Sequence, residues 1–480
     1  MGRHDRRKTP VTRTIIEYVT ALDIADKGKA FGKSNEKAIF IEGAVPGDVV
    51  DVEVFKKSKS FDEARILRII TPSPHRVEPF CPHFGICGGC KWQHMIYDGQ
   101  LHFKEKQVKD AMERIAKITA PPIAPIQGAP LTTYYRNKME FTFTNKRYLL
   151  SEEMQMDGEK DMDGLGFHIP GKFNKVLDLY QCYLQDERAN TIRLFVRDFT
   201  RNNGMTYFDL KVQNGMMRNL IIRNTTTDEW MIIVVFKEDV PDLRDALMIA
   251  IKKEFPWVTS LQYVINGKRN DTIHDQEPIV FHGRPYIIEQ LENLKFIVGP
   301  KSFFQTNSTQ ALNLYRITRE YAGLTGNEIV YDLYTGTGTI AAFMAASAKK
   351  VIGIEYVPEA IEDAIQNVRM NGIQNTEFFA GDMKNVLTAE FIKTHGQPDV
   401  IITDPPRAGM HEDVINCILA SGAEKIVYVS CNPATQARDI LLLSEKYEVT
   451  KMTPVDMFPH TAHVENVALL VRKKACPEVY

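Results

Sequence analysis

EIVYDLYTGTGTIAAFMAASAKKVIGIEY, residues 328–356, decides the fold of the C-terminal part of this 480-residue chain. An apolar run leads into a turn that contains Gly336 and Gly338, and a helical stretch and a second apolar run follow, ending near Glu355. This order is typical of a strand–helix–strand unit in a parallel sheet. Glycines in such a turn let the backbone approach a ligand closely and leave helix N–H groups free to bind it.

The alternation of strand and helix continues towards the C-terminus. Three further apolar runs each end in polar or backbone-restricting residues: NTEFFAGD at 375–382, PDVIITDPP at 398–406 and KIVYVSCNP at 425–433. Repeated units of this kind predict a doubly wound, Rossmann-like parallel sheet over residues 301–480, with helices on both faces. Ligands of such sheets bind at the carboxyl ends of the strands, so the residues after each run are candidates for a site.

Two acidic residues after the glycine turn suit a nucleoside cofactor. Glu355 lies 19 residues after Gly336, which is close to the spacing at which an acidic residue binds ribose hydroxyls. Asp382 follows the third run and could accept a hydrogen bond from an adenine amino group. Glycines also form ordinary turns, so the turn alone is weak support. The full G-x-G-x-x-G pattern is absent, which favours S-adenosylmethionine over NAD.

An aspartate and a cysteine follow the fourth and fifth runs. Asp404 opens DPPRAGM, 404–410, in which two prolines restrict the backbone to an extended form. Cys431 lies within VYVSCNPATQARD, 427–439. Cysteine is most often a small buried hydrophobe. One placed where a strand stops, among polar residues, instead favours a nucleophile in a crevice.

Acid–base candidates precede the last apolar run. HTAHVENVALL, 460–470, contains His460, His463 and Glu465, and any of these could act as a general acid or base. The pattern HxxHxE taken alone also indicates a metal site. The predicted cofactor crevice nearby favours a catalytic base.

The first 300 residues show two other patterns. Residues 11–70 alternate apolar and polar side chains in short runs separated by glycine and proline, which predicts an all-β barrel as domain 1–70. Residues 71–300 predict a mixed α/β central domain, whose strand-like runs include KMEFTFTN, NLIIRN and WMIIVVFK and whose helical runs are RANTIRLFVRDF and DLRDALMIAIKKEF. An amphipathic helix over 102–118 is expected to pack on the C-terminal domain. An acidic stretch, 156–164, predicts an exposed loop. The fold class is therefore multidomain α/β.

Composition excludes several classes of protein. The chain is 44% hydrophobic and 25% charged with a net charge of −2, and its apolar runs are far shorter than the roughly 20 residues of a membrane span. We expect a cytoplasmic protein without a signal peptide, with a monomer as the default state. Three cysteines in CPHFGICGGC, 81–90, then favour metal or cluster binding over disulfides. Basic runs at 1–13 and 56–60 indicate either solvated surface or contacts to an RNA backbone.

The motifs, taken in order, resemble one family. SFFQTN, DLYTGTGT, IGIEY, DPPRAG, VSCNPATQARD and HTAHVE resemble the RNA uracil-C5-methyltransferase family. CPHFGICGGC with the later Cys182 resembles its iron–sulfur branch, which modifies 23S ribosomal RNA, and residues 11–70 resemble the RNA-binding, OB-like TRAM domain of that branch. The resemblance implies an RNA (uracil-C5-)-methyltransferase acting on ribosomal RNA, with transfer RNA as the alternative substrate.

The resemblance also assigns residues. It implies a nucleophile at Cys431, a general base at Glu465 and a [4Fe–4S] cluster, whereas spacing alone indicates only four thiolates for a metal or cluster. The implied cluster ligands are Cys81, Cys87, Cys90 and Cys182. The S-adenosylmethionine contacts that it implies are Gln305, Tyr334, Glu355 and Asp404, to which the turn and the third strand end add Thr339 and Asp382.

The chemistry of uracil explains why a cysteine is needed. Carbon 5 is a poor nucleophile until a thiolate adds to carbon 6 and converts the ring to an enolate. The chain departs from the family pattern in three places. Thr335 stands where cysteine is more usual, 156–164 looks like an insertion, and the tail KKACPEVY, 473–480, runs past the usual end.

Two rival functions make different demands on the chain. An N-methyltransferase that holds an amino group with DPP would form no covalent adduct and would not need Cys431. A non-catalytic iron–sulfur protein that binds or assembles RNA is disfavoured, because the candidate residues of a working site are all present. Three aromatic residues could stack on bases or be ordinary core: Phe84, Trp92 and Phe304.

Overall fold

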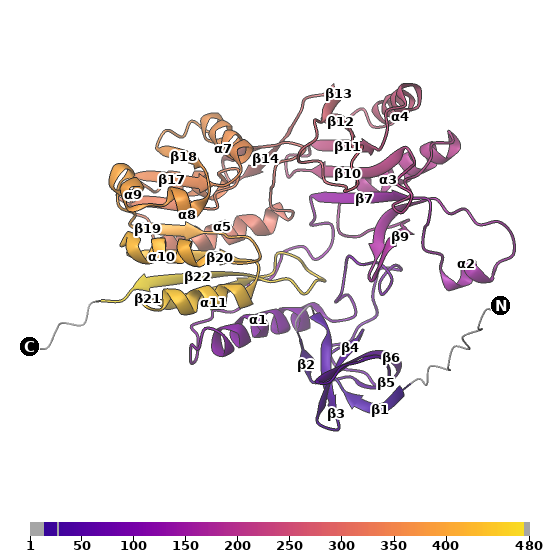
Figure 1. Ribbon diagram of the computed structural model, residues 1–480, viewed down its shortest axis with the longest axis horizontal. Helices are drawn as coiled ribbons and strands as arrows, with labels where there is room; N and C mark the ends of the chain where they lie inside the picture. Colours follow the sequence, from indigo (N-terminus) through magenta and orange to yellow (C-terminus); the bar gives the residue numbers. More distant parts are fainter. Residues whose placement is uncertain (1–13, 26–27, 475–480) are drawn as a thin grey trace, which may run out of the picture. The chain divides into compact units, whose positions relative to one another are not determined.

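The computed structural model describes residues 14–25 and 28–474, which fall into two compact units (Figure 1). The first unit comprises Met1–Gly85, Gly89–Phe103 and His460–Ala462, and the second comprises Ile86–Gly88, Lys104–Pro459 and His463–Tyr480. The basic run 1–13 and the last six residues of the tail KKACPEVY lie outside the described residues.

The first unit contains the all-β domain expected from residues 11–70. Its strands are β1 (Thr14–Thr20), β2 (Asp23–Ile24), β3 (Ala30–Ser34), β4 (Lys37–Glu42), β5 (Val49–Lys57) and β6 (Phe61–Thr71). They form one sheet in the order β1-β5-β6-β4-β3-β2, in which only β4 and β6 pair in parallel. Register shifts between β5 and β6 mark bulges, which bend a sheet. Among the described residues, no strand pair closes this sheet into the predicted barrel.

Trp92 belongs to the core of the first unit. It is buried with Val45, Met95 and Phe103, and its indole N–H donates to the carbonyl of Gly28 at 2.9 Å. The alternative that Trp92 stacks on a base is therefore wrong.

The long helix α1 (Tyr97–Arg114) begins and ends earlier than the predicted 102–118. In the second unit its residues Val108 and Met112 are fully buried in one cluster with the strands of the C-terminal domain. Lys104 of the same helix is buried and forms an ion pair of 2.5 Å with the buried Asp456. The helix ends soon before Lys117 and Ala120, which both have positive φ.

The central domain is built on a seven-stranded sheet in the order β13-β12-β11-β10-β7-β8-β9. Its strands are β7 (Lys138–Thr144), β8 (Gly164–Ile169), β9 (Lys172–Asp178), β10 (Met217–Asn224), β11 (Trp230–Phe236), β12 (Ser260–Ile265) and β13 (Ile279–Gly283). Its helices are α2 (Ser151–Gln155), α3 (Glu187–Asn202) and α4 (Pro241–Glu254). The pattern predicted β7, β10, β11 and both longer helices, but not the less regular β8, β9, β12 and β13. The stretch 156–163 is irregular and mostly exposed, as expected.

A hairpin joins the central sheet to the C-terminal domain. Strands β14 (Ile287–Leu291) and β15 (Leu294–Val298) pair in an antiparallel manner. Their buried side chains, such as Phe296, share one hydrophobic cluster with β11 and with the first helices of the C-terminal domain. The central and C-terminal domains therefore have a continuous core.

The C-terminal domain is the doubly wound sheet that the sequence predicted. Its order is β18-β17-β16-β19-β20-β22-β21, with five parallel strands followed by an antiparallel pair. Its strands are β16 (Ile329–Leu333), β17 (Lys350–Glu355), β18 (Thr376–Ala380), β19 (Val400–Thr403), β20 (Lys425–Ser430), β21 (Tyr447–Val455) and β22 (Glu465–Arg472). The order reverses between β16 and β19, which is where ligands bind on such sheets.

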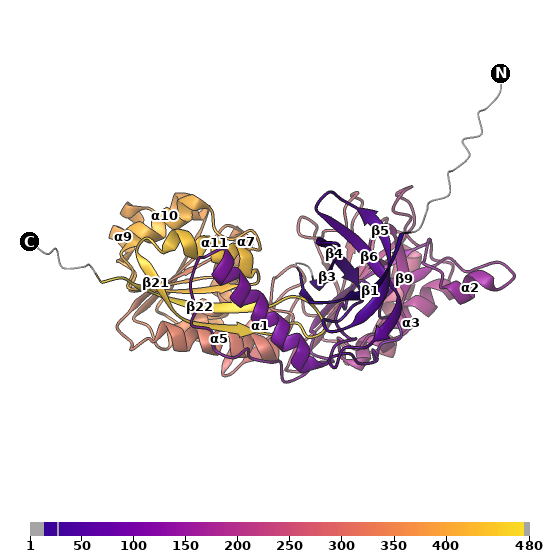
Figure 2. The ribbon, with the colours of Figure 1, turned by 90° about the horizontal axis from the view of Figure 1, so that it is seen from below.

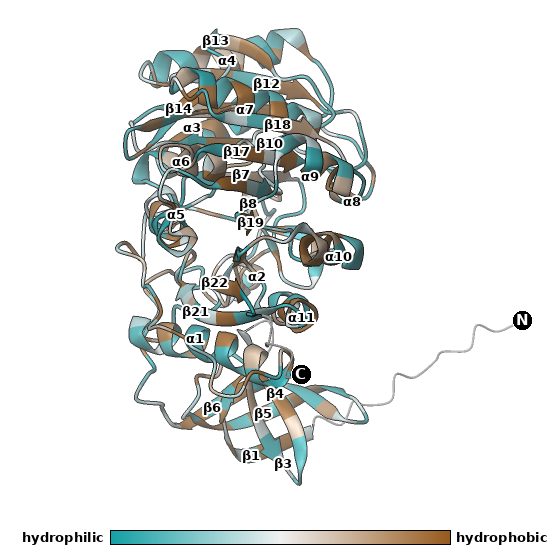
Figure 3. Ribbon diagram, turned by 90° about the vertical axis from the view of Figure 1, so that its left-hand side faces the viewer, coloured by the Kyte–Doolittle hydropathy of each residue, from teal (hydrophilic) through white to brown (hydrophobic). Residues whose placement is uncertain are grey.

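Helices cover both faces of this sheet. One core cluster contains α5 (Ser308–Ala322), α6 (Thr339–Ala345) and α7 (Pro358–Met370). The other contains α8 (Met383–Val386), α10 (Glu412–Ser421), α11 (Pro433–Leu443) and part of α1. Figure 2 shows α10 and α11 on one side of the strands and α5 on the other. In Figure 3 the short α9 (Ala389–His395) is largely hydrophilic, in keeping with its lack of buried residues.

Within the part of the chain that the structure describes, no helix combines the length and the apolar character needed to cross a membrane.

Candidate functional site

The site lies at the carboxyl edge of the C-terminal sheet. Strands β16, β17, β19 and β20 are parallel, so the residues after each strand emerge at the same edge. Strand β22 runs antiparallel to β20 and begins at this edge, where Ser430 pairs with Asn466. Cys431 and Glu465 are each one residue beyond that pair. Antiparallel pairing thus brings together two residues that lie 34 positions apart in the sequence.

The turn after β16 has an unusual backbone. Tyr334 has a φ of 63°, and Gly336 and Gly338 have φ of 55° and 74°. A bulky residue in this region is strained, and such strain is concentrated at functional sites. A Cβ on Gly338 would lie 2.8 Å from the Cβ of Ala364, whereas a Cβ on Gly336 would meet no described atom within 4 Å. Gly338 therefore serves packing, and Gly336 faces open space.

Glu355 is oriented by the turn itself. Its Oε2 accepts a hydrogen bond of 3.1 Å from the N–H of Gly336, and its Oε1 accepts one of 3.1 Å from the N–H of Val357. Each carboxylate oxygen can accept more than one hydrogen bond. The arrangement leaves acceptor capacity for hydroxyl groups of a ligand beside the open face of Gly336.

Asp332 is a buried acid at this edge that our sequence analysis missed. Burial raises its pKa to about 7, and the charges of Asp404 and Glu355 act in the same direction. The Thr335 hydroxyl donates to its Oδ2 at 2.5 Å and opposes the shift. Thr335, one of the departures from the family pattern, thus has a structural partner. The one sign of Asp332 in the sequence is that an acidic residue interrupts the apolar run of β16.

The segment around Gln305 is held by the central domain. The Asn137 amide donates to the carbonyl of Gln305 at 2.9 Å. Arg223, buried in β10, donates to the carbonyl of Ser302 at 2.7 Å and to that of Gly299. Phe304 is buried in the core, so its alternative role in stacking on a base is wrong.

Three ionisable groups influence one another beside the end of β20. Burial raises the pKa of Cys431 to about 11, and the negative charges of Glu465 and Asp404 add to the shift. Burial likewise raises the pKa of Glu465 to about 8, again with a contribution from Asp404, and that of Asp404 to about 7. Arg407 opposes the shifts of Cys431 and Glu465. The three groups therefore lie close enough for their charges to influence one another, and strongly shifted groups of this kind are frequent in active sites.

The loop of Cys431 is tied to the loop of Asp404. The Asn432 amide and the Thr435 hydroxyl both donate to the carbonyl of Arg407, at 3.0 and 3.2 Å. Asn432 also caps α11 by accepting from the N–H of Ala434. Cys431 therefore lies just before a helix N-terminus, a position that favours a thiolate.

A second set of hydrogen bonds joins β20, which ends just before Cys431, to β22, which begins at Glu465. The Gln436 amide donates to the carbonyls of Tyr428 in β20 and Asn466 in β22, at 2.9 and 3.2 Å. Asn466 donates back to Gln436 Oε1 at 2.8 Å. All of these groups are buried. Gln436 therefore positions the ends of the two strands. Its place in the VSCNPATQARD motif did not indicate this role.

Asp439 completes the support of the DPPRAGM loop. Its buried carboxylate accepts from the N–H of Met410 at 2.8 Å and from the Tyr428 hydroxyl at 2.7 Å. Arg438 pairs with the other carboxylate oxygen at 2.6 Å and also donates to the carbonyls of Ala408 and Met410. Residues 436–439, QARD, thus hold the DPPRAGM loop in place.

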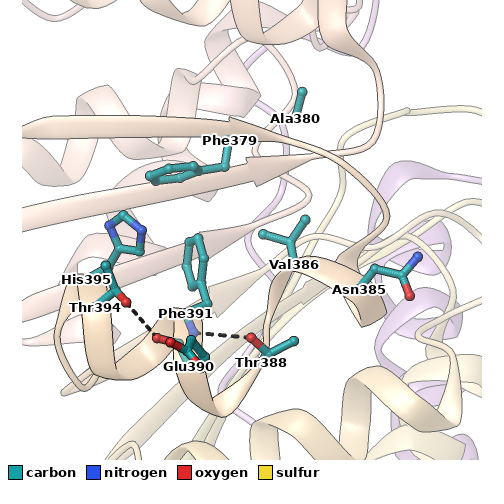
Figure 4. Close-up of a pocket in the computed structure, with 9 residues that line it drawn as sticks. All are labelled: Phe379, Ala380, Asn385, Val386, Thr388, Glu390, Phe391, Thr394 and His395. Carbon is teal, nitrogen blue, oxygen red and sulfur yellow. Dashed lines mark hydrogen bonds between the residues drawn. The ribbon is translucent and has the colours of Figure 1, made fainter.

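Thr339 and Asp382 have local structural roles. Thr339 is the first residue of α6 and is buried. Asp382 caps α8 by accepting from the N–H of Lys384 at 3.3 Å. A pocket of about 450 Å³ opens next to this region, lined by Phe379, Phe391 and His395 among others (Figure 4). None of the predicted site residues lines it, so it is separate from the crevice at the strand ends.

The two histidines of the HxxHxE pattern fall in different units. His460 falls in the first unit, where its Nδ1 lies 3.1 Å from the Gln100 amide. His463 is exposed. Across the described residues, no group of three or more His, Cys, Asp or Glu side chains could hold a metal ion. The alternative of an HxxHxE metal site therefore finds no support, and Glu465 is left as the acid–base candidate of that motif.

The four cysteines expected to bind a cluster are all partly buried. Cys81 and Cys90 fall in the first unit, and Cys87 and Cys182 fall in the second. Burial raises the pKa of Cys81, and the backbone N–H groups of His83 and Phe84 oppose that rise. Among the described residues, these cysteines form no group that could hold a metal ion, so the cluster rests on the resemblance of the sequence alone.

A sheet of this order, with a glycine turn after its first strand and an acid after its second, is typical of proteins that bind a nucleoside cofactor. Comparison with known proteins identifies the class more closely. The family model for tRNA (uracil-5-)-methyltransferase matches residues 271–473, and the model for the TRAM domain matches residues 14–67.

Similar proteins extend this match to nearly the whole chain. An RNA methyltransferase of Porphyromonas gingivalis is 57% identical over 458 residues, covering 94% of this chain and 98% of the relative. One of Chlorobaculum tepidum is 39% identical over 97% of this chain and 99% of the relative. The crystal structure of Pyrococcus abyssi tRNA (uracil-54, C5)-methyltransferase with S-adenosyl-L-homocysteine aligns with a TM-score of 0.73 and 28% identity, over 96% of this chain and 100% of that chain. The chain belongs to the RNA uracil-C5-methyltransferase family and carries its TRAM domain.

Proposed function

We propose that the chain transfers the methyl group of S-adenosylmethionine to carbon 5 of a uridine in RNA and so forms 5-methyluridine. The main observation behind this proposal is the coupling of Cys431 with Glu465 at the edge of the sheet that also carries the glycine turn. The family supports uracil in RNA as the target. The S-adenosyl-L-homocysteine bound to the Pyrococcus abyssi relative supports the cofactor.

The residues around the glycine turn fit that cofactor. The open face of Gly336 leaves room for a ligand, and the oriented carboxylate of Glu355 suits ribose hydroxyls. When bound, S-adenosylmethionine supplies an electrophilic methyl group. We assign its binding to Gln305, Tyr334, Thr339, Glu355, Asp382 and Asp404.

Cys431 activates the pyrimidine ring. Its Sγ adds to C6 as a thiolate, the electron pair of the C5–C6 bond moves towards O4, and C5 becomes nucleophilic. The thiol in the free protein holds its proton, because its pKa is raised to about 11. That proton must pass to a carboxylate at the same edge before the attack. Arg407 and the N-terminus of α11 both favour the thiolate.

Glu465 completes the reaction as the general base. After C5 has gained its methyl group, the carboxylate removes the C5 proton. The electron pair restores the C5–C6 double bond, the Sγ–C6 bond breaks, and Cys431 leaves as a thiolate. A carboxyl whose pKa is raised to about 8 is a stronger base than an ordinary glutamate and matches a reaction near neutral pH.

RNA that contains 5-fluorouracil tests this mechanism, because fluorine at C5 cannot leave as a proton. We expect a covalent adduct between the protein and the RNA when S-adenosylmethionine is present, visible as a slower band in a denaturing gel. Cys431→Ala should give no adduct. Cys417→Ala, which removes another free, half-buried thiol, should give the adduct as the wild type does. An adduct in the Cys431→Ala variant would refute the assignment.

We propose 23S ribosomal RNA as the substrate, on the resemblance of the cysteine motif and the TRAM domain to that branch. Transfer RNA is the second candidate, which the names of the family model and of the Pyrococcus abyssi relative favour. Methylation of 23S ribosomal RNA and bulk transfer RNA transcripts by the purified protein, followed by nucleoside mass spectrometry, separates the two. 5-Methyluridine confined to transfer RNA would refute the ribosomal assignment.

We also propose, from the sequence resemblance alone, that Cys81, Cys87, Cys90 and Cys182 hold a [4Fe–4S] cluster. No catalytic step depends on it. Protein purified without oxygen should be brown and contain about four iron atoms per chain. A colourless protein with one zinc atom, or with no metal, would refute the cluster. We further expect a monomer in the cytoplasm.

A further inference from the structure

A pocket of about 320 Å³ lies in the central domain, on the strands β7, β8, β9 and β10. Its volume is near the lower end of the range for sites that bind small molecules, about 300 Å³. The residues that line it lie within the ranges 142–144, 168–176, 208–219 and 269–271. None of the residues assigned to methyl transfer or to the cofactor belongs to it. No function described above accounts for this pocket.

A bulge in β10 gives the pocket its polar floor. The register of β10 against β11 shifts between Met217 and Asn219. Neighbouring residues of a regular strand point to opposite faces, and a bulge can redirect one of them. Arg218 and Asn219 are consecutive, yet both line the pocket.

Both floor residues are buried with unused hydrogen-bonding groups. Asn219 is 1% exposed, and its Oδ1 accepts no hydrogen bond from the described residues. Arg218 is 2% exposed, and its Nε likewise has no partner there. Its other nitrogens donate to loop carbonyls, including those of Asn266 and Lys268 at 2.7 Å. A buried polar atom without a partner costs about 1–3 kcal/mol, so both atoms have reason to bind a polar ligand.

Aromatic rings and charges complete the pocket. Phe143 and Phe208 are buried in its wall, and the Arg218 guanidinium lies 4.7 Å from the ring centre of Phe208. Phe173 in β9 lines the pocket while 68% exposed. Arg269 at the rim is also exposed. Aromatic faces for stacking, a buried amide for hydrogen bonding and a cation at the edge are the features by which proteins bind an unstacked base of RNA.

We propose that this pocket binds a second, unstacked base of the RNA substrate, and that this base is an adenine. The inference rests on RNA being the substrate. The side-chain amide of asparagine can accept from the N6 amino group of adenine and donate to N7 at the same time, and cytosine has no N7. Phe173 stacks on the base, and Arg269 contacts the adjoining phosphate. The pocket thereby selects an RNA by a nucleotide other than the one that is methylated.

Fluorescence polarisation with labelled A12 and C12 oligonucleotides tests the proposal. We expect the wild type to bind A12 at least fivefold more tightly than C12. Phe173→Ala should weaken A12 binding by about tenfold, within the range found when one stacking aromatic is removed. Asn219→Asp should abolish the preference for A12, because a carboxylate cannot donate to the ring nitrogen.

Ile249→Ala is the control for Phe173→Ala. It removes an exposed apolar side chain of α4 that does not line the pocket, and it should leave both affinities unchanged. Equal binding of A12 and C12 by the wild type would overturn the proposal. An equal loss in Phe173→Ala and Ile249→Ala would do the same. Because Phe173 is exposed, its variant remains informative even where Asn219→Asp fails to fold.

The adduct with 5-fluorouracil RNA separates this inference from the proposed function. Equal binding of A12 and C12 by a wild type that forms a normal Cys431 adduct would refute the pocket alone. Absence of the adduct in the wild type, with the A12 preference intact, would refute the methyl-transfer chemistry alone.

Discussion

The two seven-stranded sheets of the second unit bury opposite charges. The central sheet buries Arg218 and Arg223, whose guanidinium groups donate to backbone carbonyls. The C-terminal sheet buries Asp332, Asp404 and Glu465, whose pKa values burial raises to about 7, 7 and 8. A buried arginine bonded to carbonyls holds the chain in place, whereas a buried acid without a close cation holds a proton. One sheet therefore buries cations that hold the backbone, and the other buries acids that hold protons near neutral pH.

Glu465→Gln, in the C-terminal sheet, should have the largest effect on activity, because it keeps the shape of the side chain and removes its basicity. We expect the rate of methyl transfer to fall by about 10²–10⁴-fold, the usual contribution of a general base. Wild-type kcat/KM should rise with pH towards the pKa of about 8, because only the carboxylate accepts a proton. The measurement is a pH profile with tritiated methyl donor. A profile that is flat between pH 6 and 9 would assign the base elsewhere.

The same substitution should stabilise the protein at high pH. The folded protein holds the Glu465 proton up to a pH of about 8, whereas the unfolded chain loses it near 4.5. Ionisation of Glu465 therefore costs no stability below the unfolded pKa of 4.5. The loss of stability grows as pH rises from 4.5 to about 8 and is complete above the folded pKa of about 8. We expect Glu465→Gln to gain about 4 kcal/mol relative to the wild type on going from pH 5 to pH 9.

Denaturant unfolding at the two pH values measures that gain. Glu390→Gln, at an exposed position of α9, is the matched control and should show no comparable change. If both variants gave the same pH dependence, the buried acid would not be responsible.

Arg223→Met tests the positioning role of the central sheet. The change leaves the carbonyls of Gly299 and Ser302 without their donor, at a cost of about 1–3 kcal/mol each at most. Because the same segment leads to Gln305, we expect KM for S-adenosylmethionine to rise about tenfold while kcat changes less.

Arg244→Met provides the comparison, since Arg244 makes surface ion pairs with Asp239 and Asp245. Such pairs contribute about 0–1 kcal/mol. Isothermal titration with the cofactor should therefore distinguish the two variants. Equal affinities would show that the central sheet does not position the Gln305 segment.

The last comparison concerns two glycines of one turn. Gly338→Ala combines a positive φ with a contact of 2.8 Å to Ala364, and we expect a loss of about 2–3 kcal/mol in the free energy of unfolding. Gly336→Ala has the positive φ but open space around it, and should lose about 1 kcal/mol. Thermal unfolding of both variants measures the difference. Equal losses would mean that backbone conformation alone decides the cost.

The sequence predicted the C-terminal sheet well, because each of its parallel strands is an apolar run bounded by turn residues. It also indicated which residues emerge at the carboxyl edge, since topology alone brings strand ends together. It could not indicate Asp332 or Gln436, whose importance comes from burial and from partners in other strands. The bulge at Arg218 was equally invisible, because it exists only as a mismatch between two strands. Strands β8 and β9 escaped detection because glycine and charged residues interrupt their pattern.

The pairing of β22 with β20 has a further consequence for which homologues keep the activity. Side chains alternate along a strand, so a slip of one position would present Val464 or Asn466 to the thiol in place of the acid. An insertion or deletion between residues 456 and 464 that changed this alignment would silence the enzyme while preserving every residue named in its motifs. Loss of activity in a homologue can thus arise from loop length alone.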